Sequence, residues 1–146
     1  MDMEWQAFGR EAAHGVAYNV ALMAAIIIPL MTVLEFAREL KLLDRFSSRV
    51  TPLLRIFGMS GEASLPLLVG GVFGLAYGAG VIIESARSGK ISWRDLFLVN
   101  IFLSVFHAAI EDTALFIAVG ADPVVILGGR FLLAVVITLA ASRIIR

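Results

Sequence analysis

Long apolar stretches alternate with short polar connectors along this chain. Four stretches carry almost no charge: residues 12–34, 63–83, 96–121 and 123–142. The third is interrupted only by Glu111 and Asp112, and the fourth only by Arg130. Because a membrane-spanning helix needs about 20 predominantly apolar residues, the pattern predicts an all-α integral membrane protein with about four transmembrane helices. We expect a single domain over residues 1–146.

The connector at residues 35–57 has a different pattern. Along a helix, one face would collect its apolar side chains: Phe36, Leu40, Leu43 and Phe46. The remaining surface would be charged, through Arg38, Lys41, Asp44, Arg45 and Arg49. Such a division is typical of an amphipathic helix lying in the membrane interface. A plain charged connector is the alternative.

The composition agrees with a membrane protein and excludes several functions. Charged residues make up 16% of the chain, against about 25% in soluble domains. Twelve Lys and Arg balance twelve Asp and Glu, so no basic field would hold a nucleic acid. The absence of cysteine excludes disulfides, thiolate zinc sites and thiol catalysis. Since no nucleophile–base triad, phosphate-binding loop or metal cage is recognisable, we expect no enzymatic activity, no cofactor and no metal.

The loop charges do not orient a protein with four spans. With the N-terminus inside, the inner side would carry six Lys and Arg residues and the outer side five. Cytoplasmic loops normally carry a clear excess of these residues. Two interpretations follow. Either the chain inserts both ways or pairs with an oppositely oriented partner, or one of the four apolar stretches does not span the membrane.

Two segments that lie 50 positions apart have similar sequences. Residues 62–70 and 112–120 both begin with a carboxylate, have leucine at the fourth position and end in Val-Gly. The match predicts an internal repeat with halves of roughly 12–84 and 85–142. Each copy places a carboxylate ahead of a glycine-interrupted apolar helix, which is the pattern of broken or re-entrant helices in transporter repeats.

Polar residues are concentrated in the third apolar stretch. Four of them, spaced four, three and four apart, share one helical face: Asn100, Ser104, His107 and Glu111. Asp112 follows directly, and Arg130 lies in the next stretch. An ionised residue at the bilayer centre costs roughly 2.5–3.5 kcal/mol, so these charges must face one another, water or a ligand. The cluster therefore indicates ligand binding or proton relay, or else a satisfied network that only fixes helix packing.

Glycine and proline between residues 58 and 66 predict a break in the chain followed by a new helix. Ser60 or Glu62 can cap that helix. A helix that starts within the membrane offers free N–H groups to a polar ligand, so the segment is a binding loop, the tip of a re-entrant hairpin, or an ordinary surface loop. Small residues then recur at a spacing that lets another backbone approach closely: Pro66, Gly70, Gly74 and Gly78.

The first of these segments resembles a known family. Residues 58–70 read GMSGEASLPLLVG and are similar to the signature of the nucleoside recognition, or Gate, domain of bacterial membrane proteins, a family that includes the spore maturation proteins. The same segment is similar to the first re-entrant hairpin of concentrative nucleoside transporters. This resemblance implies that Glu62 contacts a bound solute.

The second segment adds to the resemblance. Residues 107–120 are similar to the other conserved stretch of Gate proteins, with Glu111, Asp112 and Thr113 as its polar centre. The resemblance implies a transport module in which two broken-helix repeats meet at a midplane site. It also raises the alternative that residues 50–70 and 96–120 are re-entrant hairpins instead of spans.

The leading hypothesis is a subunit of a transporter for a small polar solute, such as a nucleoside or nucleobase, in the cell inner membrane. The residues expected to bind the solute are Ser60, Glu62, Ser64, Asp112 and Thr113. Those expected to couple protons or ions are His107, Glu111, Asn100 and Arg130. Because four passes are too few to enclose a pathway, we expect a homodimer, parallel or antiparallel, or a complex with a related Gate subunit. The alternatives are a non-transporting scaffold subunit and a ferrous-iron permeation module.

Overall fold

Helices account for the regular structure of this protein. A computed structural model describes residues 2–39 and 42–145, apart from the side chains of residues 2–4, 6, 34, 37–39 and 42–48. Within these ranges the elements are seven α-helices and one short 3₁₀ helix, with no strand. Three helical stretches of this part are long and apolar enough to cross a membrane, or four if one bent pair counts as a span. The prediction of an all-α protein with about four such segments is confirmed.

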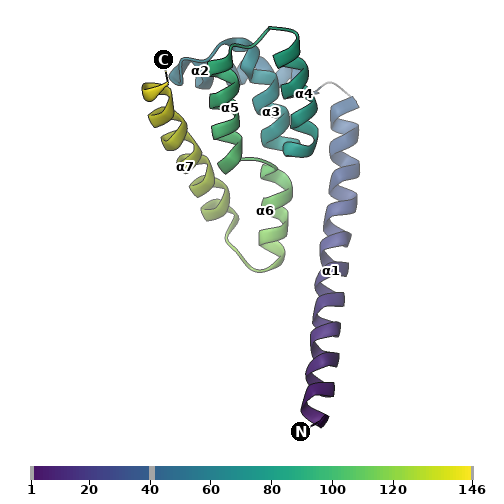
Figure 1. Ribbon diagram of the computed structural model, residues 1–146. Coiled ribbons are helices and arrows are strands. Elements are labelled where there is room, and N and C mark those ends of the chain that lie inside the picture. Colours follow the sequence, from purple (N-terminus) through teal and green to yellow (C-terminus); the bar gives the residue numbers. More distant parts are fainter. Residues whose placement is uncertain (1, 40–41, 146) are drawn as a thin grey trace.

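The first helix, α1 (Asp2–Glu39), is much longer than the others. At 1.5 Å per residue it is about 57 Å long, and Figure 1 shows its N-terminal part projecting away from the remaining helices. Near its C-terminal end, Leu30 and Met31 pack against a small apolar cluster on α3 that contains Val69 and Phe73. The candidate span within it, Ala7–Val33, is apolar and is not buried by the rest of the described chain. This surface is suited to contact with lipid.

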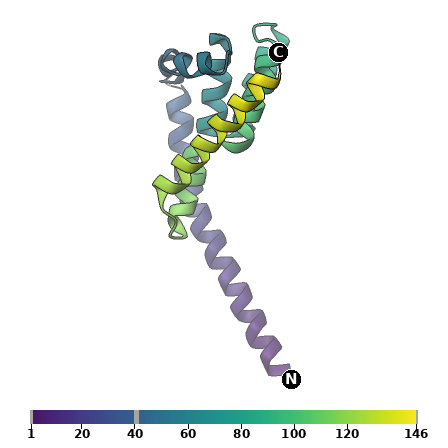
Figure 2. The same ribbon diagram turned by 90° about the vertical axis from the view of Figure 1, so that its left-hand side faces the viewer.

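The second helix, α2 (Leu42–Ile56), lies across one end of the molecule (Figures 1 and 2). After it the chain bends by 116° and passes through the 3₁₀ turn η1 (Gly61–Ala63). The bend falls where the glycines predict a break. The proposed interfacial helix includes Leu40 and Lys41 and the side chains of residues 42–48, which lie outside the described residues, so its apolar face stays a prediction.

The apolar stretch at residues 63–83 is a helical hairpin. Helix α3 (Ser64–Phe73) ends at Gly74, where helix α4 (Leu75–Arg87) begins and runs back beside it (Figure 1). The prediction of one spanning helix over this stretch is therefore wrong. The alternative of a re-entrant hairpin over residues 50–70 stays a prediction, because the segments Arg49–Ile56 and Gly61–Phe73 meet there at an angle of 116°.

Glycine makes this tight hairpin possible. Gly74 has φ +81°, in the region that favours glycine. A Cβ placed on Gly78 would lie only 2.7 Å from the Cα of Gly70, so the two helices touch backbone to backbone. The predicted close approach at the glycine stripe is confirmed, and it occurs inside the hairpin. Absence of charge alone cannot distinguish such a hairpin from a straight span, because both bury only apolar side chains.

The remaining helices form a broken span and a return helix. Helices α5 (Trp93–Val105) and α6 (Ala109–Ala118) follow one another with a break at residues 106–108, and together they are long and apolar enough to cross a membrane. Helix α7 (Pro123–Ile144) returns to the end where α5 starts (Figure 1). Residues 96–120 are thus a broken span, not a hairpin.

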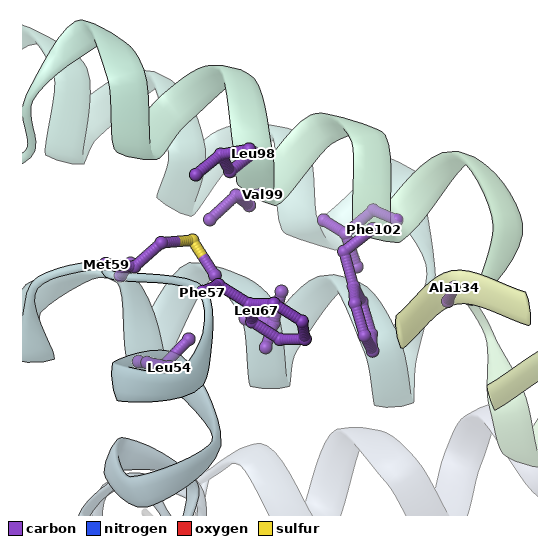
Figure 3. Packing of buried hydrophobic residues seen from close by; sticks show 10 residues of the cluster. Leu54, Phe57, Met59, Leu67, Leu98, Val99, Phe102 and Ala134 are labelled. Atoms are coloured by element: carbon purple, nitrogen blue, oxygen red, sulfur yellow. The ribbon is translucent and has the colours of Figure 1, made fainter. Parts of the chain in front are cut away.

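One hydrophobic core holds α2, α3, α5 and α7 together (Figure 3). Its buried members are Leu54, Phe57, Met59, Ala63, Leu67, Leu98, Val99, Phe102, Leu103 and Ala134. The ring of Phe102 lies near its centre, with ring centroids of Phe57, Phe106 and Phe131 at 6.1, 5.7 and 6.2 Å. Such tilted aromatic contacts add to the stabilisation from burial itself. The core therefore fixes the position of α5 immediately before its break.

Candidate functional site

The break between α5 and α6 exposes backbone groups in the middle of an apolar segment. Phe106 has φ −126° and ψ 78°, and Ala108 has φ +45° and ψ 42°, so neither continues the helix. Carbonyl groups before the break lose the partners that an intact helix would give them. Within a membrane such groups need another donor. The break is therefore a place where side chains or a ligand must supply hydrogen bonds.

Arg130 on α7 supplies several of these bonds. Its Nε donates to the carbonyl oxygen of Val105 at 3.1 Å, and its Nη2 to that of His107 at 3.2 Å. Its Nη1 donates to Oδ2 of Asp112 at 2.7 Å, which is also an ion pair. The side chains of Arg130 and Asp112 are 23% and 27% exposed. The sequence predicts that Arg130 and Asp112 need partners, and here they pair with each other. Arg130 also bonds two backbone carbonyls at the break in the helix.

The tip of the α3–α4 hairpin lies against the same break. The backbone N–H of Ala108 donates to the carbonyl of Gly70 at 3.3 Å. A Cβ built on Gly74 would come within 3.1 Å of the Cβ of Ala108. The hairpin and the broken span therefore meet at one point. We call the break, Arg130 and the first turn of α6 the polar centre.

Several polar groups of the polar centre have capacity for further bonds. Glu111 is half-buried, and no hydrogen bond or ion pair joins its carboxylate to another described residue. The buried Oγ1 of Thr113 also lacks a partner there. His107 contacts the carbonyl oxygen of Leu103 through Nδ1 at 3.0 Å. Because that oxygen can only accept, Nδ1 carries the proton, and the Nε2 of a neutral ring remains an acceptor.

The other predicted polar positions of α5 lie away from these contacts. Asn100 donates to the carbonyl of Leu96 at 2.8 Å, and Ser104 to that of Ile101 at 2.7 Å. Both side chains are exposed. The shared helical face that predicts the cluster is interrupted by the break, because Phe106 and Ala108 change the direction of the chain before Glu111.

The first predicted group of site residues surrounds η1. Ser60 and Glu62 are exposed, whereas Ser64 is buried and donates from Oγ to the carbonyl of Gly61 at 2.6 Å. This group lies at the start of α3, and the polar centre lies at the other end of that helix. Ten helical residues extend about 15 Å. Within one chain, the structure therefore does not bring Glu62 together with Asp112.

Two residues that the sequence interpretation missed hold the loop before η1. The buried carboxylate of Asp95 accepts a hydrogen bond from the backbone N–H of Ser60 at 3.1 Å. Arg94 donates to the carbonyls of Gly58, Ser142 and Ile145 at 2.8, 3.1 and 2.9 Å. Residues 92–95 read Ser-Trp-Arg-Asp, a sequence pattern typical of the start of a helix. Its contacts with segments 35 to 51 residues away in the chain are not visible in the sequence.

Replacing Asp95 with alanine should lower the free energy of unfolding by about 2 kcal/mol, because it removes a buried acceptor and leaves the N–H of Ser60 without a partner. Thermal unfolding in detergent measures the change. Glu84→Ala is a suitable control, since Glu84 is exposed. Equal stability of the two variants would contradict a role for Asp95 in holding this loop.

Taken together, the helices and the polar centre define a small α-helical membrane protein with a helical hairpin docked on a broken span. The chain belongs to the nucleoside recognition (Gate) family, whose profile matches residues 20–123. The resemblance inferred from residues 58–70 and 107–120 is thereby confirmed. Family membership indicates a transport-related role in a membrane.

A membrane protein of Bacillus subtilis is similar to nearly the whole of this chain. The chain is 39% identical over 138 residues to the uncharacterized membrane protein YvoD of Bacillus subtilis (strain 168). The match covers 94% of this chain and 44% of that protein, so the chain spans less than half the length of this relative. No solved structure is significantly similar to the chain.

Proposed function

We propose that the chain is a subunit of a transporter that binds a small polar solute at the polar centre. The observation that carries this proposal is the broken span beside the hairpin tip, where Glu111 and Thr113 have polar groups without partners among the described residues. Polar groups inside a membrane need hydrogen-bond partners. A bound polar solute would supply them.

The solute we propose is a nucleoside or a nucleobase-like molecule. The description of the family as nucleoside recognition supports this class. Asp112 and Thr113 would contact the solute, while His107 and Glu111 would carry the coupled proton. Arg130 would hold the break open by bonding its carbonyls, and so act as a positioning residue. Within the described residues no group of three or more His, Cys, Asp or Glu could hold a metal ion, so no observation favours ferrous-iron permeation.

A partner is part of the proposal. Three or four spans are too few to enclose a pathway across the inner membrane, so a second copy or a related Gate subunit would complete it. Ser60, Glu62 and Ser64 lie at the far end of α3 and would meet the solute at the entrance, not at the polar centre. Asn100, on the exposed face of α5, would lie toward the partner or the lipid.

A scaffold without transport activity is the second candidate. It is favoured by one observation: Arg130 already bonds two carbonyls and Asp112, which is what a purely structural network requires. Under this alternative, the chain would stabilise a membrane complex, and its carboxylates would bind no solute.

A thermal-shift screen of the detergent-purified protein tests the two candidates. Nucleosides, nucleobases, amino acids and Fe²⁺ form the panel. A solute present at 100 times its Kd should stabilise the protein by about 2.7 kcal/mol. A shift with a nucleoside or nucleobase supports the proposal, and the same result with an amino acid would move it to another solute class. No shift across the panel would favour the scaffold.

Glu111→Gln separates binding from stability. Because no hydrogen bond or ion pair joins the half-buried Glu111 carboxylate to another described residue, the variant should unfold at nearly the same temperature as the parent. It should nevertheless lose the stabilisation by the solute, since the amide cannot accept as the carboxylate does. Glu84→Gln, on the exposed surface of α4, is the control. Retention of the full shift in Glu111→Gln would exclude Glu111 from the site.

A further inference from the structure

The hairpin changes the number of times that the chain crosses the membrane. Helices α3 and α4 have 10 and 13 residues, or about 15 and 20 Å, which is shorter than the roughly 30 Å hydrocarbon core. The hairpin therefore enters and leaves on the same side. The crossing segments are then α1, the α5–α6 pair and α7, which makes three.

Three crossings place the connecting segments in two groups. Figures 1 and 2 show α2, the loop between α4 and α5, and the C-terminus at one end of the molecule. The hydrogen bonds of Arg94 to Gly58, Ser142 and Ile145 hold the end of α2, the start of α5 and the end of α7 together there. The N-terminus and the α6–α7 turn point the other way. We call the first group the basic end.

Lysine and arginine are distributed very unequally between the two ends. Ten of the twelve lie in the described part of the chain, which leaves out Lys41 and Arg146. Arg130 is inside the spans, and Arg10 is at the N-terminal end. The other eight belong to the basic end: Arg38, Arg45, Arg49, Arg55, Arg87, Lys90, Arg94 and Arg143. Four spans would divide the loop charges nearly evenly, whereas three give eight against one.

Acidic residues do not cancel this imbalance. Within the described ranges, the acidic residues whose backbone lies at the basic end are Glu35, Glu39, Asp44, Glu62, Glu84 and Asp95. Orientation in the membrane follows the number of Lys and Arg residues in short loops, and Asp and Glu contribute little to it. The loops here are short, so the rule applies to each of them.

We propose that the chain inserts in one orientation, with the basic end at the cytoplasmic face and the N-terminus of α1 outside. The even charge distribution expected for four spans then disappears, and insertion in both directions is no longer needed to explain it. Two copies in one membrane would be parallel, and an inverted partner would have to be a different chain. This inference does not depend on solute binding at the polar centre.

The absence of cysteine in the chain makes the orientation directly measurable. Single-cysteine variants Ser60→Cys, Ser88→Cys and Val119→Cys would be treated with a membrane-impermeant maleimide in spheroplasts and, as a reactivity control, in lysed membranes. All three positions are exposed. We expect Val119→Cys to react in spheroplasts, and Ser60→Cys and Ser88→Cys to react only after lysis.

Each other pattern overturns a defined part of the inference. Reaction of Ser60→Cys and Ser88→Cys from opposite sides would mean that residues 63–83 span the membrane after all. The reverse pattern would overturn the orientation, and partial reaction of all three from outside would mean insertion in both directions. If Ser88→Cys does not accumulate in the membrane, Lys90→Cys reports on the same α4–α5 loop. If Val119→Cys does not accumulate, Ala121→Cys reports on the same α6–α7 turn.

Discussion

Arg130→Gln is expected to lower the free energy of unfolding by about 3 kcal/mol. The substitution removes the charge that pairs with Asp112 and the donors that bond the carbonyls of Val105 and His107. Breaking a buried pair leaves the other charge uncompensated, at a cost of about 3–5 kcal/mol. The lower figure applies because Arg130 and Asp112 are each about a quarter exposed. Chemical denaturation of the protein in detergent micelles measures the difference.

Three further variants show whether the ion pair or the fork of donors matters. Arg130→Lys keeps the charge but cannot bond two carbonyls and a carboxylate at once, so it should also be less stable than the parent. Adding Asp112→Asn to Arg130→Gln should cost less than the two single changes together, because no unpaired charge remains. Arg143→Gln, exposed near the end of α7, is the matched control and should be neutral. If Arg130→Gln were as stable as this control, the network would not hold the break.

The apolar pattern was sufficient to predict helices and most of the spans, because a membrane allows few other ways to satisfy the backbone. The same pattern did not predict that residues 63–83 fold back as two short helices. Whether residues 63–83 span or turn back depends on the backbone at Gly74 and on the space between Gly70 and Gly78. Both are properties of the folded hairpin, and they cannot be predicted from the hydropathy of the sequence.

The polar centre was predictable in part. The cost of an unpaired charge in an apolar segment predicts that Asp112 and Arg130 need partners, and the structure pairs them with each other. The break at Phe106 and Ala108 was not predictable, because neither residue is a usual helix breaker. Glu62 and Asp112 each lie in the first turn of a short helix, as the repeat suggests. The repeat itself remains a prediction.

The contacts of Asp95 show the limit of reading motifs along the chain. A serine three residues before an aspartate predicts the start of α5, and Ser92 does cap it by accepting from the N–H of Asp95 at 3.1 Å. The carboxylate, however, bonds Ser60, 35 residues earlier. The Asp95 carboxylate can hold this loop only because α2 and α5 pack against each other. A local sequence pattern gives no information on such packing.

Gly78→Ala is expected to destabilise the protein by about 3 kcal/mol, the upper part of the usual range for overpacking. The added Cβ would lie 2.7 Å from the Cα and 3.1 Å from the N of Gly70. Both atoms belong to the backbone, so no side chain can turn aside, and α3 and α4 would have to move apart. Because the hairpin tip touches Ala108 at the break, the separation should also weaken any solute shift at the polar centre.

Gly80→Ala is the matched control for this prediction. Gly80 lies in the same helix, and a Cβ there would meet nothing within 4 Å. Since alanine is favoured over glycine in a helix by up to about 1 kcal/mol, this variant should be neutral or slightly more stable. Thermal unfolding of both variants in the same detergent compares them directly. Equal stabilities would mean that α3 and α4 do not touch backbone to backbone, and the three-span topology would lose the contact on which its hairpin depends.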